Sequence, residues 1–138
     1  MTTVTRRFEF PMGHALPRNA GPCAHLHGHN YVVDVTVSAA ELNADGMIVD
    51  FADLEHAASK FIDEELDHRF LIHRDDPRAE ALLGLDATVM LVDWYPTAEN
   101  LAEFVLRGVG EALNSGACVV DEVTLWETSD CSATIRRS

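Results

Sequence analysis

Three histidines lie directly before a strand-like segment, and this arrangement constrains the chain more than any other feature. Residues 23–29 read Cys-Ala-His-Leu-His-Gly-His, and alternating apolar and polar residues follow over 31–38. Because side chains alternate between the two faces of an extended backbone, His27 and His29 project from the same side. A third imidazole from a neighbouring strand would complete a three-nitrogen site, the usual ligand set of a catalytic zinc with one open position. The pattern predicts a metalloenzyme, with His14 as the lone histidine upstream.

Cys23 leaves two interpretations open. As a thiolate, it can close a structural zinc shell as the fourth protein ligand. It can equally work beside an open metal position as an acid or a base, because a nearby zinc ion or protonated histidine favours the thiolate. The other two cysteines, Cys118 and Cys131, are interpreted as ordinary structural residues.

Length and composition restrict the class of protein. With 138 residues the chain has room for one core, so we expect a single domain over 1–138. An apolar content of 47% argues against disorder. No apolar run approaches the ~18 residues of a membrane span, and the N-terminus lacks a signal-peptide core, so we expect a cytoplasmic protein. An odd number of cysteines, three, argues against a disulfide framework.

The charge of the chain bears on its partners. A net charge of −13 argues against a nucleic acid or an anionic membrane as partner, because neutralising phosphates requires clustered Lys and Arg. A small phosphorylated ligand remains compatible, since a few cations and backbone N–H groups can hold one. The candidate cations for holding such a ligand are Arg18, Lys60, Arg69 and Arg74.

Hydrophobic periodicity predicts an α+β fold. Strand-like patterns occupy the ranges 3–11, 31–38, 119–126 and 134–136, and a turn at 43–46 predicts a hairpin whose returning strand begins at 47–49. Helical apolar stripes cover 51–66 and 101–113, behind the N-cap candidates Asp50 and Thr97. Residues 73–84 are expected to form a loop with a short helical piece, and 87–92 a short strand or a loop edge. This order predicts a small antiparallel sheet with two helices on one face.

Several short motifs follow one another along nearly the whole chain. They are His14, Cys23 with His27-Gly-His29, Gly-Met-Ile-Val-Asp-Phe at 46–51, Leu-Asp-His at 66–68, Pro-Thr-Ala-Glu-Asn-Leu at 96–101 and Trp-Glu-Thr at 126–128. No single motif is decisive, but the ordered set resembles the 6-pyruvoyl- and 6-carboxy-tetrahydropterin synthase family. Three residues separate Cys23 from the His-Gly-His motif, which resembles the carboxy-tetrahydropterin synthases of queuosine biosynthesis.

Two segments depart from the family pattern. The stretch 11–16, Pro-Met-Gly-His-Ala-Leu, lacks the arginine that usually follows the first zinc histidine, and 74–93 is longer than in compact members. Neither departure touches the expected metal or acid–base residues.

The resemblance implies a fold and an assembly. The fold would be the tunnelling fold, an α+β domain whose sheet joins those of other subunits to close a barrel. Members form trimers and commonly hexamers, with active sites at subunit contacts. We therefore expect a homo-oligomer, either a trimer or a hexamer.

The resemblance also implies a zinc centre with a thiol beside it. His14, His27 and His29 would hold the ion, which would act as a Lewis acid on the substrate side chain. Cys23 would be the general base that removes a carbon-bound proton.

The remaining site residues follow from the same resemblance. Asp67 and His68 would form a second acid–base element, in which the carboxylate orients the imidazole, although a histidine at a helix C-terminus is also favoured by the helix dipole. Glu127 would accept hydrogen bonds from the amino and ring N–H groups of a pterin, or would simply be a charged strand end. Thr97 and Glu99 would assist substrate binding, although helix capping explains both equally well.

The reaction implied by the resemblance is conversion of 7,8-dihydroneopterin triphosphate to 6-carboxy-5,6,7,8-tetrahydropterin, with release of acetaldehyde and triphosphate. The alternative within the family is 6-pyruvoyl-tetrahydropterin synthase, which eliminates triphosphate without carbon–carbon cleavage. Two alternatives from other classes are a non-catalytic zinc-binding module closed by Cys23 and a zinc hydrolase that uses metal-bound hydroxide. The hydrolase gives no reason for a thiol beside the metal.

Overall fold

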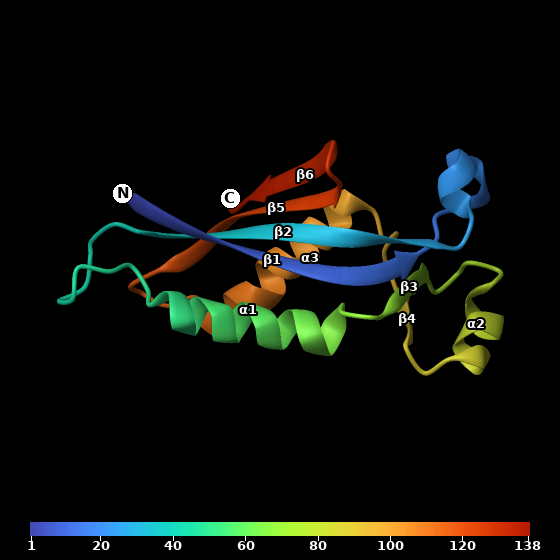
Figure 1. The fold of residues 1–138 in the computed structure, drawn as a ribbon, viewed down its shortest axis with the longest axis horizontal. Helices are drawn as coiled ribbons and strands as arrows, with labels where there is room; N and C mark the ends of the chain where they lie inside the picture. Colours follow the sequence, from blue (N-terminus) through green and yellow to red (C-terminus); the bar gives the residue numbers. More distant parts are fainter.

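Two long paired strands run through the middle of the molecule in the computed structural model, which describes residues 1–138 (Figure 1). Strand β1 (Thr2–His14) and strand β2 (His27–Ala39) are antiparallel and stay in register over their whole length. His14 is the last residue of β1, so this strand extends three residues beyond its predicted end. The alternation over 31–38 is confirmed, because Tyr31 and every second residue after it are buried.

The complete sheet has six strands in the order β4-β3-β1-β2-β5-β6. The other strands are β3 (Phe70–His73), β4 (Val89–Val92), β5 (Val119–Thr128) and β6 (Cys131–Arg136). Because β3 is parallel to both β1 and β4, the sheet is mixed, and the prediction of a purely antiparallel sheet is wrong. Strand β3 follows helix α1 and strand β4 follows helix α2, because parallel pairing requires a crossover connection.

Helices α1 (Phe51–Glu65) and α3 (Ala98–Leu113) cover one face of this sheet (Figure 1). Both predicted N-caps are confirmed: the Asp50 carboxylate accepts a hydrogen bond from the Ala52 N–H, and the Thr97 hydroxyl accepts one from the Asn100 N–H. Their apolar faces meet the buried face of the central strands. The core includes Phe10, Tyr31, Val33, Val35, Leu54, Ile62, Leu101, Val105 and Leu125.

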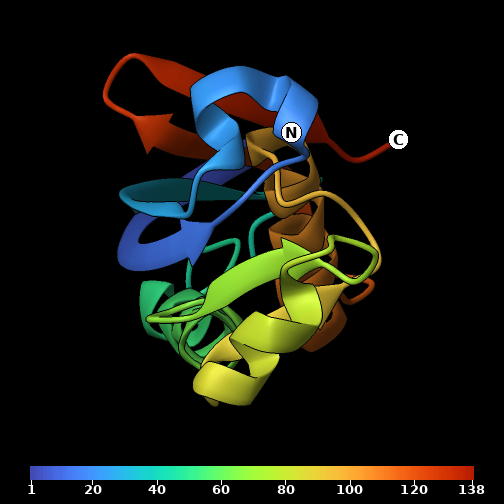
Figure 2. The same cartoon turned by 90° about the vertical axis from the view of Figure 1, so that its right-hand side faces the viewer.

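Two short helices lie at the end of the sheet where β1 stops (Figures 1 and 2). The 3-10 helix η1 (Arg18–Ala24) connects β1 to β2, and α2 (Ala79–Leu85) connects β3 to β4. Helix α2 confirms the expected short helical piece. Of the two alternatives for residues 87–92, a strand or a loop edge, the strand is correct, because β4 lies within this range. None of the helices combines the length and the apolar character needed to cross a membrane.

The predicted hairpin return at 47–49 is wrong. Both edges of β2 are already occupied, by β1 and by β5, so no edge is open to a returning strand. Instead, the Asn43 side chain accepts hydrogen bonds from the N–H groups of Asp45 and Met47, which closes a compact turn. Ile48 then packs into the core as a loop residue and leads to the start of α1.

The crossing of α1 and α3 generates a testable prediction at Gly108. A Cβ atom at this position would lie 2.0 Å from the Phe61 ring. We expect Gly108→Ala to lower the free energy of unfolding by about 1–3 kcal/mol through overpacking, despite the better helix propensity of Ala. Gly84→Ala on α2 is the matched control, because a Cβ there meets nothing within 4 Å and should stabilise by up to about 1 kcal/mol. Urea denaturation measures both; unchanged stability in the Gly108 variant would contradict the prediction.

Candidate metal centre and neighbouring acid–base groups

The ends of β1 and β2 bring three imidazoles together. His14 and His27 are direct cross-strand partners, and His29 lies two residues further along β2 on the same face. One ring nitrogen from each of the three lies within 4.8 Å of the others, a grouping that can hold a metal ion. His14 is fully buried, whereas His27 and His29 are partly exposed.

Two backbone carbonyls determine which ring nitrogens face this centre. A carbonyl only accepts hydrogen bonds, so the His14 Nδ1–H donates to Pro96 O at 2.6 Å and the His27 Nδ1–H donates to His25 O at 2.7 Å. Each Nε2 atom therefore carries a lone pair, and the two lie 3.0 Å apart. Hydrogen bonds from the outer ring nitrogen to a carbonyl orient metal-binding histidines in this way. The Nε2 of His29 is buried without a hydrogen-bond partner, as expected for an atom that binds a metal ion.

Burial keeps these imidazoles in the form that binds metal. Desolvation lowers the pKa of His14 and also the pKa of His29 below the ordinary value, so both rings are neutral at neutral pH. A neutral imidazole offers a lone pair to a cation, whereas a protonated one does not.

Tyr31 lies against the centre and was predicted only as an apolar strand residue. Its ring is 5.4 Å from that of His29 and 6.0 Å from that of His14, centroid to centroid. The hydroxyl is buried without a partner, and burial raises the pKa of Tyr31, so the phenol stays neutral. An aromatic residue two positions after His29 shares its face, and this spacing was the available signal in the sequence.

Glu127 reaches the same centre from the buried face of β5. Val123 and Leu125 are buried, and Glu127 is the next alternate residue, so it shares their face although the pairing of β5 with β6 shifts register between Trp126 and Thr128. The Glu127 Oε1 lies 3.4 Å from His14 Nε2 and 3.5 Å from His29 Nε2. The carboxylate therefore faces the histidine cluster, as the alternation of buried residues along β5 indicates.

Asp67 and His68 follow the end of α1 and contact each other directly. The His68 Nδ1–H donates to the Asp67 carboxylate at 2.8 Å, which leaves Nε2 as the open nitrogen of an exposed ring. His68 has a left-handed backbone, with φ 58°, and its N–H donates to Pro11 O on β1. This is a strained conformation for a residue other than glycine, and such strain is concentrated at functional sites.

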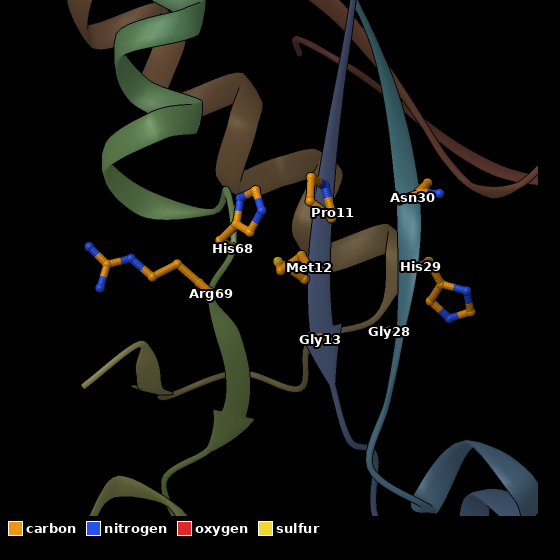
Figure 3. A pocket seen from close by; sticks show the side chains of 8 residues that line it. All are labelled: Pro11, Met12, Gly13, Gly28, His29, Asn30, His68 and Arg69. Carbon is orange, nitrogen blue, oxygen red and sulfur yellow. The ribbon is translucent and has the colours of Figure 1, made fainter. Parts of the chain in front are cut away.

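His68 lines an open pocket of about 380 Å³ together with residues of β1 and β2 (Figure 3). The other lining residues are Pro11, Met12, Gly13, Gly28, His29, Asn30 and Arg69. Gly13 and Gly28 pair across the strands at the floor, where a Cβ on Gly13 would lie 2.5 Å from the Phe70 ring. In Figure 3 the His68 ring lies beside β1, whereas the His29 ring points away from it, beyond β2.

The other predicted site residues, Cys23, Thr97 and Glu99, do not belong to the three-histidine group. Cys23 is exposed on η1, and its carbonyl accepts a hydrogen bond from the Leu16 N–H at 3.1 Å. Thr97 caps α3, and Glu99 is exposed in the first turn of that helix. His25 contributes its carbonyl to the orientation of His27, a role that sequence reasoning missed.

A mixed sheet under two helices, with three imidazoles at its end, defines an α+β protein with a candidate metal centre. Residues 3–138 match the model of the family described as 6-pyruvoyl tetrahydropterin synthase. A protein of Rickettsia felis named 6-carboxy-5,6,7,8-tetrahydropterin synthase is 34% identical, over 95% of this chain and 97% of its own length. A protein of Aquifex aeolicus with the same name is 30% identical, over 94% of each chain.

Solved structures agree with these relatives. An uncharacterized protein from Wolinella succinogenes superimposes with a TM-score of 0.85 at 26% identity, covering 99% of this chain and 98% of that one. The 6-pyruvoyl tetrahydropterin synthase of Caenorhabditis elegans gives a TM-score of 0.76 at 25% identity, covering 99% and 96% of the two chains. The chain therefore belongs to the 6-pyruvoyl tetrahydropterin synthase family, and it is a lyase of that family.

The histidine cluster generates a prediction about metal content. We expect the purified protein to bind about one metal ion per chain through these three nitrogens. His27→Ala and His29→Ala should each lose the ion, because removing one of three ligands weakens the site strongly. Elemental analysis after dialysis measures this, with the exposed His56→Ala on α1 as a matched control. Full metal content in both cluster variants would reject the three-histidine centre.

Proposed function

We propose that this lyase is a zinc-dependent 6-carboxy-tetrahydropterin synthase. Its substrate would be 7,8-dihydroneopterin triphosphate, and its products 6-carboxy-5,6,7,8-tetrahydropterin, acetaldehyde and triphosphate. The observation that carries the proposal is the convergence of three Nε2 atoms in a chain whose relatives bear this enzyme name. The spacing of Cys23 from the His-Gly-His motif supports the same choice.

His14, His27 and His29 would hold the metal through their Nε2 atoms. A zinc ion bound there would supply Lewis-acid polarisation to the hydroxyl or carbonyl groups of the substrate side chain. Pro96 O and His25 O keep two of the rings in the required tautomer. The metal-binding nitrogens therefore need no reorganisation when an ion arrives.

Two elements of the chain would move protons. Cys23 would remove the carbon-bound proton as a general base, and its exposed position on η1 leaves the thiol accessible to substrate. His68 would exchange a proton through Nε2, while its Nδ1–H remains held by Asp67. Two separate groups suit a reaction that must both take up and deliver protons.

Glu127 would bind the pterin ring next to the metal ligands. Its carboxylate lies near the Nε2 atoms of His14 and His29, where it can accept N–H groups of a pterin bound next to the metal. Thr97 and Glu99 would assist binding from the start of α3, which Pro96 O connects to the His14 ring.

The active site would be completed by a second copy of the chain. The rings of His68 and His29 point to different sides of the β1–β2 pair in one chain. Both edges of the sheet, β4 and β6, also lack a neighbouring strand, and open edges favour pairing with other chains. A trimer or hexamer that closes the sheets into a barrel would bring His68 of one copy towards the metal centre of another. It would also pair the open edges of the sheets.

A second candidate within the family is 6-pyruvoyl-tetrahydropterin synthase. The likeness to the Caenorhabditis elegans enzyme of that name favours it. This reaction would use the same metal and proton-transfer residues but would leave the side-chain carbons joined. Because the chain is a lyase of this family, the non-catalytic zinc module and the zinc hydrolase are both set aside.

The two synthases are separated by their products. We expect the purified protein to release acetaldehyde from 7,8-dihydroneopterin triphosphate and to form the 6-carboxy product, because carbon–carbon cleavage distinguishes this reaction. Mass analysis of the pterin and an enzymatic assay of acetaldehyde measure both. Triphosphate release with a 6-pyruvoyl product and without acetaldehyde would instead assign the second candidate.

The role of Cys23 can be tested by one substitution and two measurements. If the thiol is the general base, Cys23→Ala should retain zinc and fold while turnover falls by about 10²–10⁴-fold. Cys131→Ala is the matched control, since that thiol is also exposed but lies on β6. Loss of zinc together with unfolding would favour a fourth-ligand role. Normal zinc with near-normal turnover would reject both roles.

Sharing of the site between copies predicts complementation. His27→Ala and His68→Ala should each be inactive, the first through loss of metal and the second through loss of proton transfer. Mixed oligomers, formed by co-expressing the two variants with different tags, should regain part of the activity, because some sites combine two intact halves. Light scattering establishes that the purified species is an oligomer. A fully active monomer, or mixed oligomers without recovered activity, would contradict a shared site.

A further inference from the structure

One arginine connects the two short helices at the end of the sheet. The Arg78 guanidinium forms two hydrogen bonds to the Asp76 carboxylate, Nε to Oδ1 at 3.0 Å and Nη2 to Oδ2 at 2.8 Å. The same group donates through Nη2 to Leu16 O at 3.1 Å and through Nη1 to Ala24 O. Arg78 directly precedes α2, whereas both carbonyls belong to the β1–β2 connection.

These two carbonyls lie at the base of the loop that carries Cys23. Leu16 stands just before the loop 17–24, and Ala24 is its last residue and its only buried one. The Leu16 N–H also donates to Cys23 O, which closes the base a second time. The residues beyond this base are exposed or half-exposed, and Gly21 adopts a left-handed backbone with φ 69°. The loop therefore depends on its base for a defined conformation.

Asp76, the partner of Arg78 outside the loop, is nearly buried and lies beside a packed part of the molecule. The Asp76 side chain is only 8% exposed, and its hydrogen bonds with Arg78 lower the pKa of this carboxyl, so the pair stays ionised. Beside it, a small separate core packs α2 against the strands beneath. Its buried members are Ala15, Ile72, Ala79 and Val89. Arg78 is therefore held by the nearly buried Asp76 next to the packed helix α2, while its remaining donors reach the loop.

We propose that Arg78 is the positioning residue for Cys23: together with Asp76, it clamps the base of loop 17–24 and so holds the thiol in its working place. The clamp itself rests on the hydrogen bonds above, whereas its catalytic consequence rests on the proposed function of Cys23. Arg78 does not contact the thiol and acts through the backbone on either side of it.

The geometry of the clamp requires arginine. A guanidinium presents five N–H donors in a planar fork, so it can pair with a carboxylate on one edge and still reach two carbonyls. A lysine ammonium has three donors around one atom and cannot span these three partners. We therefore expect Arg78→Lys to behave much like Arg78→Met.

Loop order can be measured without any assay of turnover. Trypsin cleaves after exposed Arg18 only if the loop can open, and alkylation by iodoacetamide reports the surroundings of Cys23, with Cys131 as an internal standard. In Arg78→Met we expect cleavage at Arg18 to rise by about tenfold or more, since two charge-assisted hydrogen bonds are lost. The alkylation rate of Cys23 should change while that of Cys131 does not. The control is Arg107→Met, which breaks only an exposed ion pair with Glu103 on α3.

Turnover then tests the positioning role. In Arg78→Met we expect kcat to fall by up to about 10²-fold with KM and zinc content nearly unchanged, because a small misplacement of a reacting group slows chemistry more than binding. Arg107→Met should keep the wild-type kcat. An Arg78→Met protein with an opened loop and normal kcat would overturn the positioning role, and so would an unopened loop.

The ionic partner Asp76 offers a second, independent test of the clamp. If Arg78→Met does not fold, Asp76→Asn preserves the packing but loses the ionic partner, and it should produce the same changes at Arg18 and Cys23 to a smaller degree. If Asp76→Asn also leaves the loop closed, the clamp is rejected. If wild-type protein turns over neither pterin reaction, the proposed function fails, while the proteolysis and alkylation results still decide for or against the clamp.

Discussion

The register between β1 and β2 is the constraint on which both the core and the candidate metal centre depend. Side chains alternate with a period of two, so the pairing that places Phe10 against Tyr31 also places His14 against His27. A slip of one residue would turn the apolar set and the histidines to the opposite face together. The burial of apolar side chains along these strands thus stabilises the alignment that brings the imidazoles to a common point. The apolar core and the histidine cluster therefore lie at different positions along the same face of the β1–β2 pair.

The centre is organised by polar groups whose burial would be costly if they were left alone. His14 is fully buried, and desolvation of an imidazole is acceptable only when its polar atoms have partners. Pro96 O satisfies one nitrogen, and this carbonyl directly precedes the N-cap of α3. The start of the second main helix is therefore coupled to the first histidine. This coupling explains why a motif that reads as a simple helix start lies next to the metal ligands in space.

Local features of the fold could be predicted from the sequence, and non-local pairings could not. The shared face of His27 and His29 and the caps at Asp50 and Thr97 follow from backbone periodicity and capping chemistry, which act over a few residues. The hairpin at 47–49 failed because the partners of β2 come from distant segments. Strand β3 was missed altogether, since four residues carry almost no periodic signal and its parallel neighbours are remote in sequence.

The candidate site shows the same division. The residue types and spacing of the histidines could be recognised, and alternation after Val123 and Leu125 turns Glu127 to the buried face. The pairing of β5 with β2 that brings Glu127 to the histidines is non-local and could not be predicted. The pairing of Asp67 with His68 was expected from the family resemblance, whereas the left-handed backbone of His68 that accompanies it could not be predicted. That conformation is stabilised from outside, through the bond from the His68 N–H to Pro11 O on β1. The strand that carries His14 thus also fixes the backbone of His68, so the ligand and the acid–base element depend on a single framework, whereas the thiol stands on a loop that needs its own support.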